Sequence, residues 1–256
     1  MSAAVGIAGI GLWSPTCQSA TAWVQRQSET ELAVPRGGVL PAMQRRRASA
    51  LTRAALDAAV QAAAGLAGEP LNLAMPAVVF GSAWGETSAL GELLSQLREP
   101  GSELSPTRFA ASVHNAGIGQ LSIATGQQGF ATSLAAGEAT LAMALFEAQS
   151  LLASGEKDVL LVVADAEPPN FLSSLRCSPF AVAVWLTASV PHGAPALGPL
   201  EQGVMLPMQG DIPVDLQQNP CRFALALVDA VLGGRVAHVA LGASWSVTVT
   251  PAMGAA

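Results

Sequence analysis

The chain has 256 residues, of which 51% are hydrophobic and 12% are charged, and its formal net charge is −6. Because Lys157 is its single lysine, no extended basic face is available for nucleic acid, and we exclude that class of partner. No stretch reaches the roughly 18–20 uninterrupted apolar residues of a membrane span. The N-terminus lacks the positive region of a secretion signal, so we expect a cytoplasmic protein. A surface with so few charges leaves apolar area for a partner to cover.

Cysteine and histidine usage gives little support for a disulfide framework or a metal site. The three cysteines are widely separated and odd in number, which favours small buried side chains over disulfides. The three histidines have no metal-ligand spacing to one another, to cysteine or to acidic residues. These six residues are Cys17, Cys177, Cys221, His114, His192 and His238. The glycines Gly6, Gly9 and Gly11 do not fit the G-x-G-x-x-G fingerprint, so we predict neither a metal nor a cofactor.

Strands and helices alternate through the first hundred residues. Residues 5–12, VGIAGIGL, are typical of a short buried strand, and residues 18–27 favour a short helix. The alanine-rich run 48–64 predicts a helix that directly follows Arg45, Arg46 and Arg47. Residues 73–80 end in the buried-strand signature AVVF and lead through GSAWGE to a helix over 86–98. Ser82 directly follows its glycine, so this turn is not the G-x-S-x-G nucleophile elbow.

Residues 104–119, LSPTRFAASVHNAGIG, have no clean period but combine aromatic and polar side chains within an apolar chain. The distinctive members are Phe109, His114 and Asn115. Such a mixture is typical of a segment at an interface or lining a pocket. A buried pair formed by His114 and Asn115 is the alternative, and the sequence favours neither. Residues 116–124 continue as a helix in either case.

The central stretch, residues 130–152, is predicted to be a tight turn that leads into a buried helix. Small residues precede residues 135–137, where we expect the helix to open, and Leu141, Leu145 and Leu152 then recur at helical spacing. A residue at a helix N-terminus meets a partial positive charge and unpaired N–H groups, which suits a nucleophile. This turn offers Leu134, which cannot be a nucleophile, and Ser133, which needs a base that no nearby sequence supplies.

The remaining chain completes a layered α/β prediction. Residues 158–164 and 179–187 are apolar runs that predict neighbouring buried strands with a right-handed crossover. Residues 188–220 are rich in proline and glycine and predict no element. A helix is expected over 221–232, and one or two strands over 236–249.

Five segments, in this order, resemble the N-terminal half of a β-ketoacyl synthase, an enzyme of thiolase-like fold. They are VGIAGIGLWSP at 5–15, AVVFGSAWGE at 77–86, LSPTRFAASVHNAGIGQLSIATG at 104–126, TSLAAGEATLAMALFEA at 132–148 and DVLLVVADAEPP at 158–169. The sequence is most similar to short ketosynthase-like proteins of aryl polyene pigment pathways. The resemblance implies a ketosynthase-like thiolase half over 1–187 and a short, divergent C-terminal part over 188–256, packed on the same domain.

The resemblance also implies that catalysis is lost. Working members carry the acyl chain on the cysteine of T-A-C-x-x-G, and matching Thr132 and Gly137 to that motif puts Leu134 at the cysteine position. A register shift of one residue would put Ser133 there, which does not restore the thiol. The family's downstream H-G-T-G-T motif is missing, since His192 is followed by Gly-Ala-Pro. We therefore predict no catalytic residue.

By this resemblance the chain is a chain length factor, a noncatalytic subunit that pairs with an active β-ketoacyl synthase in polyketide or fatty acid-type biosynthesis. In such heterodimers the subunits join through their sheets, and the inactive partner closes the far end of the acyl tunnel. The residues expected at the junction or tunnel are Phe109, Ser112, His114, Asn115, Phe130 and Leu134.

Two other functions stay open. Ser133 would serve an acyltransferase or thioesterase if His114, the nearest candidate in sequence, acted as its base. Alternatively, the chain would be a module that binds acyl carrier proteins through Arg45, Arg46 and Arg47. An ordinary solvated helix start explains these arginines equally well, although cations there oppose the helix dipole.

Overall fold

The computed structural model describes residues 4–203, 206–207 and 210–252, and its strands form one eight-stranded sheet in the order β3-β2-β4-β5-β1-β6-β8-β7. The strands are β1 (Val5–Trp13), β2 (Ala77–Gly81), β3 (Ala131–Leu134), β4 (Asp158–Asp165), β5 (Phe180–Thr187), β6 (Ala196–Gln202), β7 (Ala237–Gly242) and β8 (Trp245–Thr250). β2 runs parallel to β3 and β4, and the other pairs are antiparallel. The sheet therefore ends at β3 on one side and at β7 on the other.

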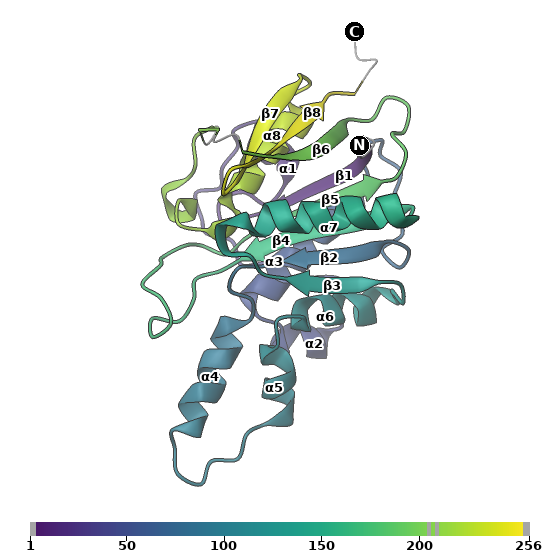
Figure 1. Cartoon of the computed structure of the whole chain (residues 1–256). Helices are drawn as coiled ribbons and strands as arrows, with labels where there is room; N and C mark the ends of the chain where they lie inside the picture. The colour runs from purple at the N-terminus through teal and green to yellow at the C-terminus, as the bar shows by residue number, and fades with distance from the viewer. Residues whose placement is uncertain (1–3, 204–205, 208–209, 253–256) are drawn as a thin grey trace.

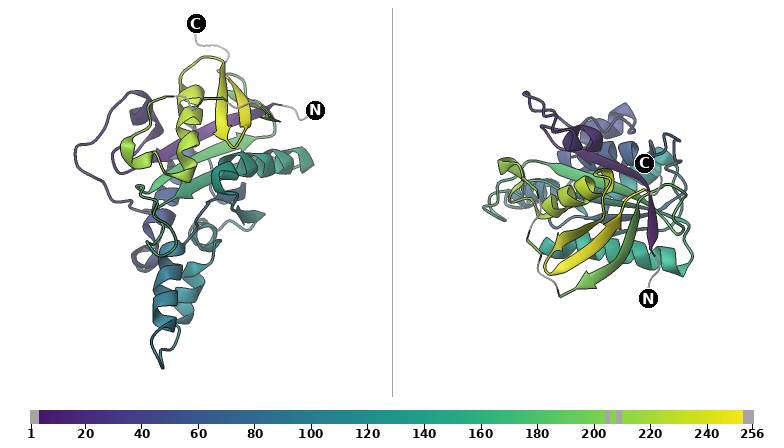
Figure 2. Two further views of the ribbon diagram at one scale, coloured as in Figure 1. Left: turned by 60° about the vertical axis from the view of Figure 1, so that its left-hand side comes forward. Right: turned by 90° about the horizontal axis from the view of Figure 1, so that it is seen from above.

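Helices cover both faces of this sheet (Figure 1). The α-helices are α1 (Ala20–Val24), α2 (Ala42–Arg47), α3 (Ala50–Ala62), α4 (Thr87–Leu97), α5 (Pro106–Ser112), α6 (Ala116–Thr125), α7 (Thr140–Ser154) and α8 (Ala224–Leu232). Three short 3₁₀ turns are η1 (Gly137–Ala139), η2 (Val214–Leu216) and η3 (Pro220–Phe223). α4 and α5 form a helical hairpin that projects from the body (Figures 1 and 2).

The central strands are buried on both faces because their side chains alternate between two cores. In β4, Leu160 and Val162 join the core under α3 and α6, whereas Leu161 and Val163 join the core under α7. A strand with helices on both faces reads as a continuous apolar run, which is why DVLLVVA was recognisable. β4 and β5 are neighbours, as predicted, but they are antiparallel and joined by a loop. The helical crossover through α7 instead joins β3 to β4, with β2 between them.

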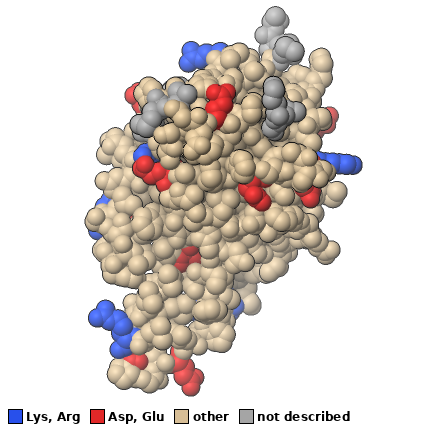
Figure 3. All heavy atoms as spheres, viewed as in Figure 1, with Lys and Arg blue, Asp and Glu red and all other residues tan. Residues whose placement is uncertain are grey.

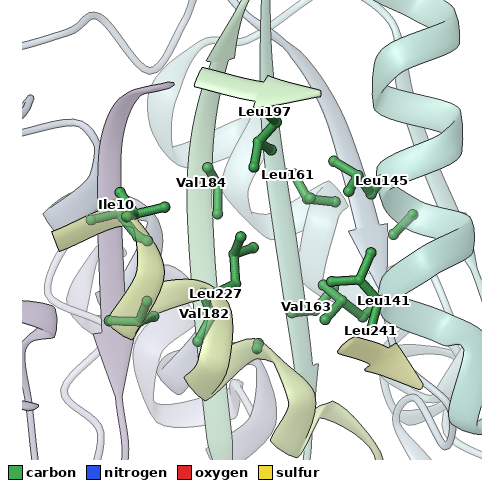
Figure 4. Packing of buried hydrophobic residues seen from close by; sticks show 14 of the residues in the cluster. Ile10, Leu141, Leu145, Leu161, Val163, Val182, Val184, Leu197, Leu227 and Leu241 are labelled. Carbon is green, nitrogen blue, oxygen red and sulfur yellow. The ribbon is translucent and has the colours of Figure 1, made fainter. Parts of the chain in front are cut away.

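The C-terminal strands β6 and β7 pack in the same core as α7. Leu241 on β7 and Leu197 on β6 belong to the same core as Leu145 on α7, together with Leu227 on α8 (Figure 4). α7 therefore packs against β2 and β4 on one side and contacts β6 and β7 on another. The boundary between a ketosynthase-like half and a C-terminal part, expected at residue 187, stays a prediction. Strands that precede residue 187 and strands that follow it belong to the same sheet.

Two predicted helix starts are wrong. α7 begins at Thr140 rather than at 135–137, because Thr140 Oγ1 accepts the Ala136 N–H at 3.0 Å and donates to the Gly137 carbonyl at 2.7 Å. α3 begins at Ala50 with Ser49 as its N-cap, so the three arginines are not its first turn.

Those arginines occupy the last turn of the separate helix α2, where a cation favours the helix dipole instead of opposing it. The predicted end of the central helix is confirmed, since Gly155 caps α7 at a φ of +119°. Within the described residues, no helix combines the length and hydropathy needed to cross a bilayer.

Replacing Leu145 by alanine is expected to lower the free energy of unfolding by about 2–5 kcal/mol, because the cavity would form in the centre of the core. Leu145 is 0% exposed, whereas its neighbour Phe146 is 54% exposed. Phe146→Ala should change the free energy of unfolding by only about 0.5 kcal/mol. Urea denaturation followed by circular dichroism measures both, and equal losses would contradict this packing of α7.

Candidate functional site

A pocket of about 620 Å³ lies between α6 and the edge strand β3, and we call it the edge pocket. It is lined by His114, Asn115, Ile118, Gly119, Ser122, Ala131, Thr132, Ser133, Leu134 and Ala135. Four residues singled out in the sequence therefore meet here, namely His114, Asn115, Ser133 and Leu134. No Asp, Glu, Lys or Arg lines the edge pocket.

Leu134 is the last residue of β3, and its partly buried side chain packs against the core under α7. Its carbonyl accepts the Ser82 N–H at 3.1 Å, which ties the end of β3 to the loop after β2. The expectation that Leu134 sits at the tip of a helix is wrong, since β3 and η1 precede Thr140, the first residue of α7.

Ser133 Oγ is buried and has no hydrogen-bond partner among the described residues. A serine nucleophile needs a base within hydrogen-bond reach to take its proton. His114 lines the same pocket, but its Nε2 lies 2.8 Å from the Ser82 carbonyl oxygen. A carbonyl can only accept, so Nε2 carries a proton and donates it there.

His114 is held in place by the loop between β2 and α4. Its ring stacks edge-on against Phe80 with ring centroids 6.4 Å apart. A Cβ on Gly85 would lie 2.7 Å from His114 Cδ2, and Gly85 has a φ of +62°, so glycine is needed for both space and conformation. Asn115 is exposed, so the alternative of a buried His114–Asn115 pair is wrong.

Asp165 anchors this loop from the end of β4. Its fully buried carboxylate accepts bonds from Ser82 Oγ at 2.7 Å, from the N–H groups of Ala83 at 2.9 Å and Trp84 at 3.0 Å, and from Cys221 Sγ at 3.2 Å. Burial raises the pKa of Asp165, although these donors act to lower it. Ser82 bonds the carboxylate directly without an imidazole between them, so this is a structural clamp and not a catalytic triad.

Glu86 anchors the start of α4 in a similar way. Only 6% of Glu86 is exposed, and its Oε1 accepts bonds from Ser49 Oγ at 2.9 Å and from Thr52 Oγ1. Burial raises the pKa of Glu86, against the opposing effects of these two bonds and of nearby His114. Sequence reasoning missed both acids, because their partners are distant along the chain.

The cysteines are free and buried, in agreement with the sequence prediction. Desolvation by burial raises the pKa of Cys177 to about 11, and the pKa values of Cys17 and Cys221 are also raised by burial. Thiols held in this way are poor nucleophiles. Cys221 additionally has a polar role, as a donor to Asp165.

The other predicted site residues lie outside the edge pocket. Phe109 is 60% exposed on α5, and Ser112 Oγ donates to its carbonyl at 2.9 Å. Phe130 is 45% exposed and immediately precedes β3. Arg45, Arg46 and Arg47 are exposed on α2.

Arg47 also lines a second pocket of about 630 Å³, which lies beside the starts of α3, α4 and α5. We call it the hairpin pocket. Its lining includes the charged residues Arg108, Glu86, Glu92 and Glu167. Across the described residues, no three His, Cys, Asp or Glu side chains group in a way that could hold a metal ion.

The sequence model of the family "Beta-ketoacyl synthase, N-terminal domain" matches residues 19–233. The chain belongs to this family. No curated protein sequence matches it. The ketosynthase-family match spans α1 to α8, so it includes the strand and helix that form the edge pocket, β3 and α6.

Solved structures show the same thiolase-like fold. One is a chain from the complex of the ketosynthase ApeO with its chain length factor ApeC from Xenorhabdus doucetiae, at 22% identity and a TM-score of 0.69, covering 97% of this chain and 99% of that chain. Another comes from the ishigamide ketosynthase/chain length factor, at 15% identity and a TM-score of 0.63, and the match covers 78% of this chain and 67% of that chain. A third comes from AntDE:AntF, a type II polyketide acyl carrier protein in complex with its ketosynthase. It matches at 17% identity and a TM-score of 0.60, covering 78% of this chain and 69% of that chain.

The other two histidines of this ketosynthase-family chain lie away from Leu134. His238 is on β7, where Nδ1 lies 3.0 Å from Thr248 Oγ1 and Nε2 lies 3.3 Å from Ser246 Oγ. His192 is exposed in the loop between β5 and β6. Neither lines the edge pocket.

The E86Q variant is expected to flatten the pH dependence of stability. Because the folded pKa of Glu86 is raised above its ordinary value of 4.5, its stabilising contribution is complete below the unfolded pKa and is lost as the pH rises through the folded pKa. The glutamine amide oxygen can still accept from Ser49 and Thr52, since both bond the same oxygen of Glu86. Urea denaturation at a series of pH values from about 4.5 to about 8 should show that the free energy of unfolding falls less with rising pH for E86Q than for wild type. If the free energies of unfolding of E86Q and wild type changed equally with pH, the raised pKa of Glu86 would be contradicted.

Proposed function

We propose that this chain is a noncatalytic subunit of the chain length factor type, which pairs with an active β-ketoacyl synthase and shapes its acyl tunnel. The biosynthesis served would be of an aryl polyene, a polyketide or a fatty acid-type product. The observation that carries the proposal is Leu134, whose hydrocarbon side chain packs into the core at the position that the family's motif gives to the nucleophilic cysteine.

The similar structures support this pairing. ApeO with ApeC and the ishigamide proteins are both ketosynthases solved with chain length factors. The match to the ApeO–ApeC complex covers 99% of a chain, so a ketosynthase-like protein of this extent occurs in such an assembly. AntDE:AntF adds an acyl carrier protein to a ketosynthase, which supports the carrier as a further partner.

The open end of the sheet supports a partner at β3. An edge strand leaves backbone N–H and C=O groups that invite another strand, and proteins usually protect such an edge. Here large apolar side chains are exposed around β3, since Phe130 precedes it and Ile123, on the contacting helix α6, is 71% exposed. Charged side chains are also sparse over much of the face in Figure 3. A partner that covers β3 would bury this apolar surface and close the edge pocket.

The acyl tunnel would then reach the edge pocket from the partner. His114, Asn115 and Leu134 line this pocket, so half of the residues expected at the junction already share one cavity. Phe109, Ser112 and Phe130 would lie around it on the surface that the partner covers. An overpacked tunnel costs about 1–3 kcal/mol per intruding group, which is enough to limit the chain that fits.

An acyltransferase or thioesterase that uses Ser133 has less support. Its hydroxyl has no hydrogen-bond partner among the described residues, and the nearest candidate base, His114, donates to a backbone carbonyl. Both groups would have to rearrange before proton transfer.

Coexpression with the ketosynthase of its own pathway should give a stable heterodimer on size-exclusion chromatography. Phe130→Glu is expected to weaken that heterodimer by about tenfold or more, because a charge would be buried at the junction. Phe146→Glu is the matched control, because Phe146 is also exposed but lies on α7 and neither adjoins β3 in the sequence nor lines the edge pocket. A wild-type chain that stays monomeric beside its ketosynthase would overturn the proposal.

We further propose that Arg45, Arg46 and Arg47 contact the acidic surface of an acyl carrier protein. All three are exposed on one short helix, where their charges add. Reversing all three to glutamate is expected to weaken carrier binding by about tenfold or more, since each exposed ion pair contributes about 0.2–1 kcal/mol. Arg98→Glu, an exposed arginine beyond α4, is the control. Titration of the purified heterodimer with carrier protein measures this affinity. If the triple glutamate variant bound the carrier as tightly as wild type, the proposed contact with the arginines would be contradicted.

A further inference from the structure

A third pocket, of about 700 Å³, lies between the loop over residues 33–39 and α3, and we call it the loop pocket. Most of its wall is apolar, and the side chains that form this part are Trp13, Ala33, Val34, Val39, Val60 and Leu73. It shares no lining residue with the edge pocket or the hairpin pocket. Its volume is in the range of small-molecule sites. The loop pocket is therefore a separate cavity, to which the proposed function gives no role.

The loop beside this pocket is tied to α3 by its backbone. Asp57 on α3 accepts the N–H of Arg36 at 2.6 Å and the N–H of Gly37 at 2.9 Å. Gly37 has a φ of +57°, and a Cβ on it would lie 2.7 Å from Arg53 Cγ, so glycine suits this position in both conformation and space. A cavity whose wall is already fixed binds a ligand without the entropy cost of ordering a loop.

Two hydrogen-bond donors of the lining have no partner within the described part of the chain. The guanidinium of Arg36 forms no ion pair there. Trp13 is only 3% exposed, yet its indole N–H donates to no described residue. By contrast, Gln61 Oε1 accepts the Leu12 N–H at 3.2 Å, and Gln61 Nε2 donates to the Gln18 carbonyl at 2.8 Å. The two unused donors are available to acceptor groups of a ligand.

The charges of the loop pocket favour an anionic head group. Arg36 and Asp57 are its only charged lining residues. Both oxygens of Asp57 already accept backbone N–H groups, so an ammonium group would have to share them. The Arg36 guanidinium is not engaged in this way, and a guanidinium can bind a carboxylate through two parallel hydrogen bonds. The lining therefore matches an apolar molecule with one carboxylate.

We infer that the loop pocket binds a free fatty acid-type carboxylate, whose alkyl chain lies along the apolar wall and whose carboxylate lies on Arg36. A thioester has no carboxylate for Arg36 to recognise, so the ligand is a released acid and not a carrier-bound chain. This inference does not rest on the proposed function, because the site is formed within this chain and lies outside the edge pocket.

The test is calorimetric titration of the full chain with decanoate, decan-1-ol and decylamine. We expect decanoate to bind about tenfold or more tightly than the alcohol, because only the carboxylate gains charge-assisted hydrogen bonds from Arg36. Arg36→Gln should remove this preference and leave the affinity for decan-1-ol unchanged. Arg98→Gln, at an arginine that lines none of the three pockets, is its matched control and should keep the preference.

A second variant places the alkyl chain. Val60→Glu should weaken decanoate and decan-1-ol alike by about tenfold or more, because a charge would enter the apolar wall. Val60 is exposed, so the folded chain should accept the substitution, and thermal melting checks this. Val236→Glu is the matched control, since Val236 is also exposed but does not line the loop pocket.

Three results would overturn the inference and leave the proposed function standing. Wild-type chain that binds none of the three ligands would show that the loop pocket is not an alkyl site. Tighter binding of decylamine than of decanoate would make Asp57, and not Arg36, the contact of the head group. Decanoate affinity unchanged in both Arg36→Gln and Val60→Glu would place the ligand in another cavity. Pairing with the ketosynthase is measured separately, so its failure would leave this inference intact.

Discussion

The packing of α7 is the constraint on which the rest of the structure depends. This helix contacts β2 and β4 and also β6 and β7, and its buried leucines belong to one core with strands from distant parts of the chain (Figure 4). Because α7 directly follows the turn after β3, its position also fixes where Leu134 and the edge pocket lie. A helix buried on two sides needs small and apolar residues on most of its surface, which explains the run TLAMALFEAQSLL.

Two buried carboxylates hold the loop between β2 and α4 beside the edge pocket. Asp165 fixes the first half of this loop through Ser82, Ala83 and Trp84, and Glu86 fixes its end against α3. His114 then donates to the same loop at the Ser82 carbonyl. Asp165, Glu86 and His114 are therefore engaged in positioning the backbone of this loop.

Much of the fold could be predicted from the sequence because buried strands and amphipathic helices are local patterns. AVVF and DVLLVVA became β2 and β4, and the hairpin of β7 and β8 lies within the stretch expected to hold one or two strands. β6 was missed because Gly198 and Pro199 interrupt it, and the register of its pairing with β8 shifts at that point. The helix start at Thr140 was missed because side-chain bonds to the backbone decide it. The site was only partly predictable, since Leu134 follows from a motif whereas the Asp165 clamp needs contacts across 83 and 56 residues.

The Asp165 clamp has a consequence for the order in which the protein can mature on the ribosome. The carboxylate can be desolvated at low cost only when all its donors are present, and the thiol of Cys221 is synthesised 56 residues after it. The apolar face of α7 likewise waits for β6, β7 and α8. A nascent chain that has emerged only as far as β5 therefore carries an uncovered hydrophobic layer, and chaperone contact during this interval would protect it from aggregation.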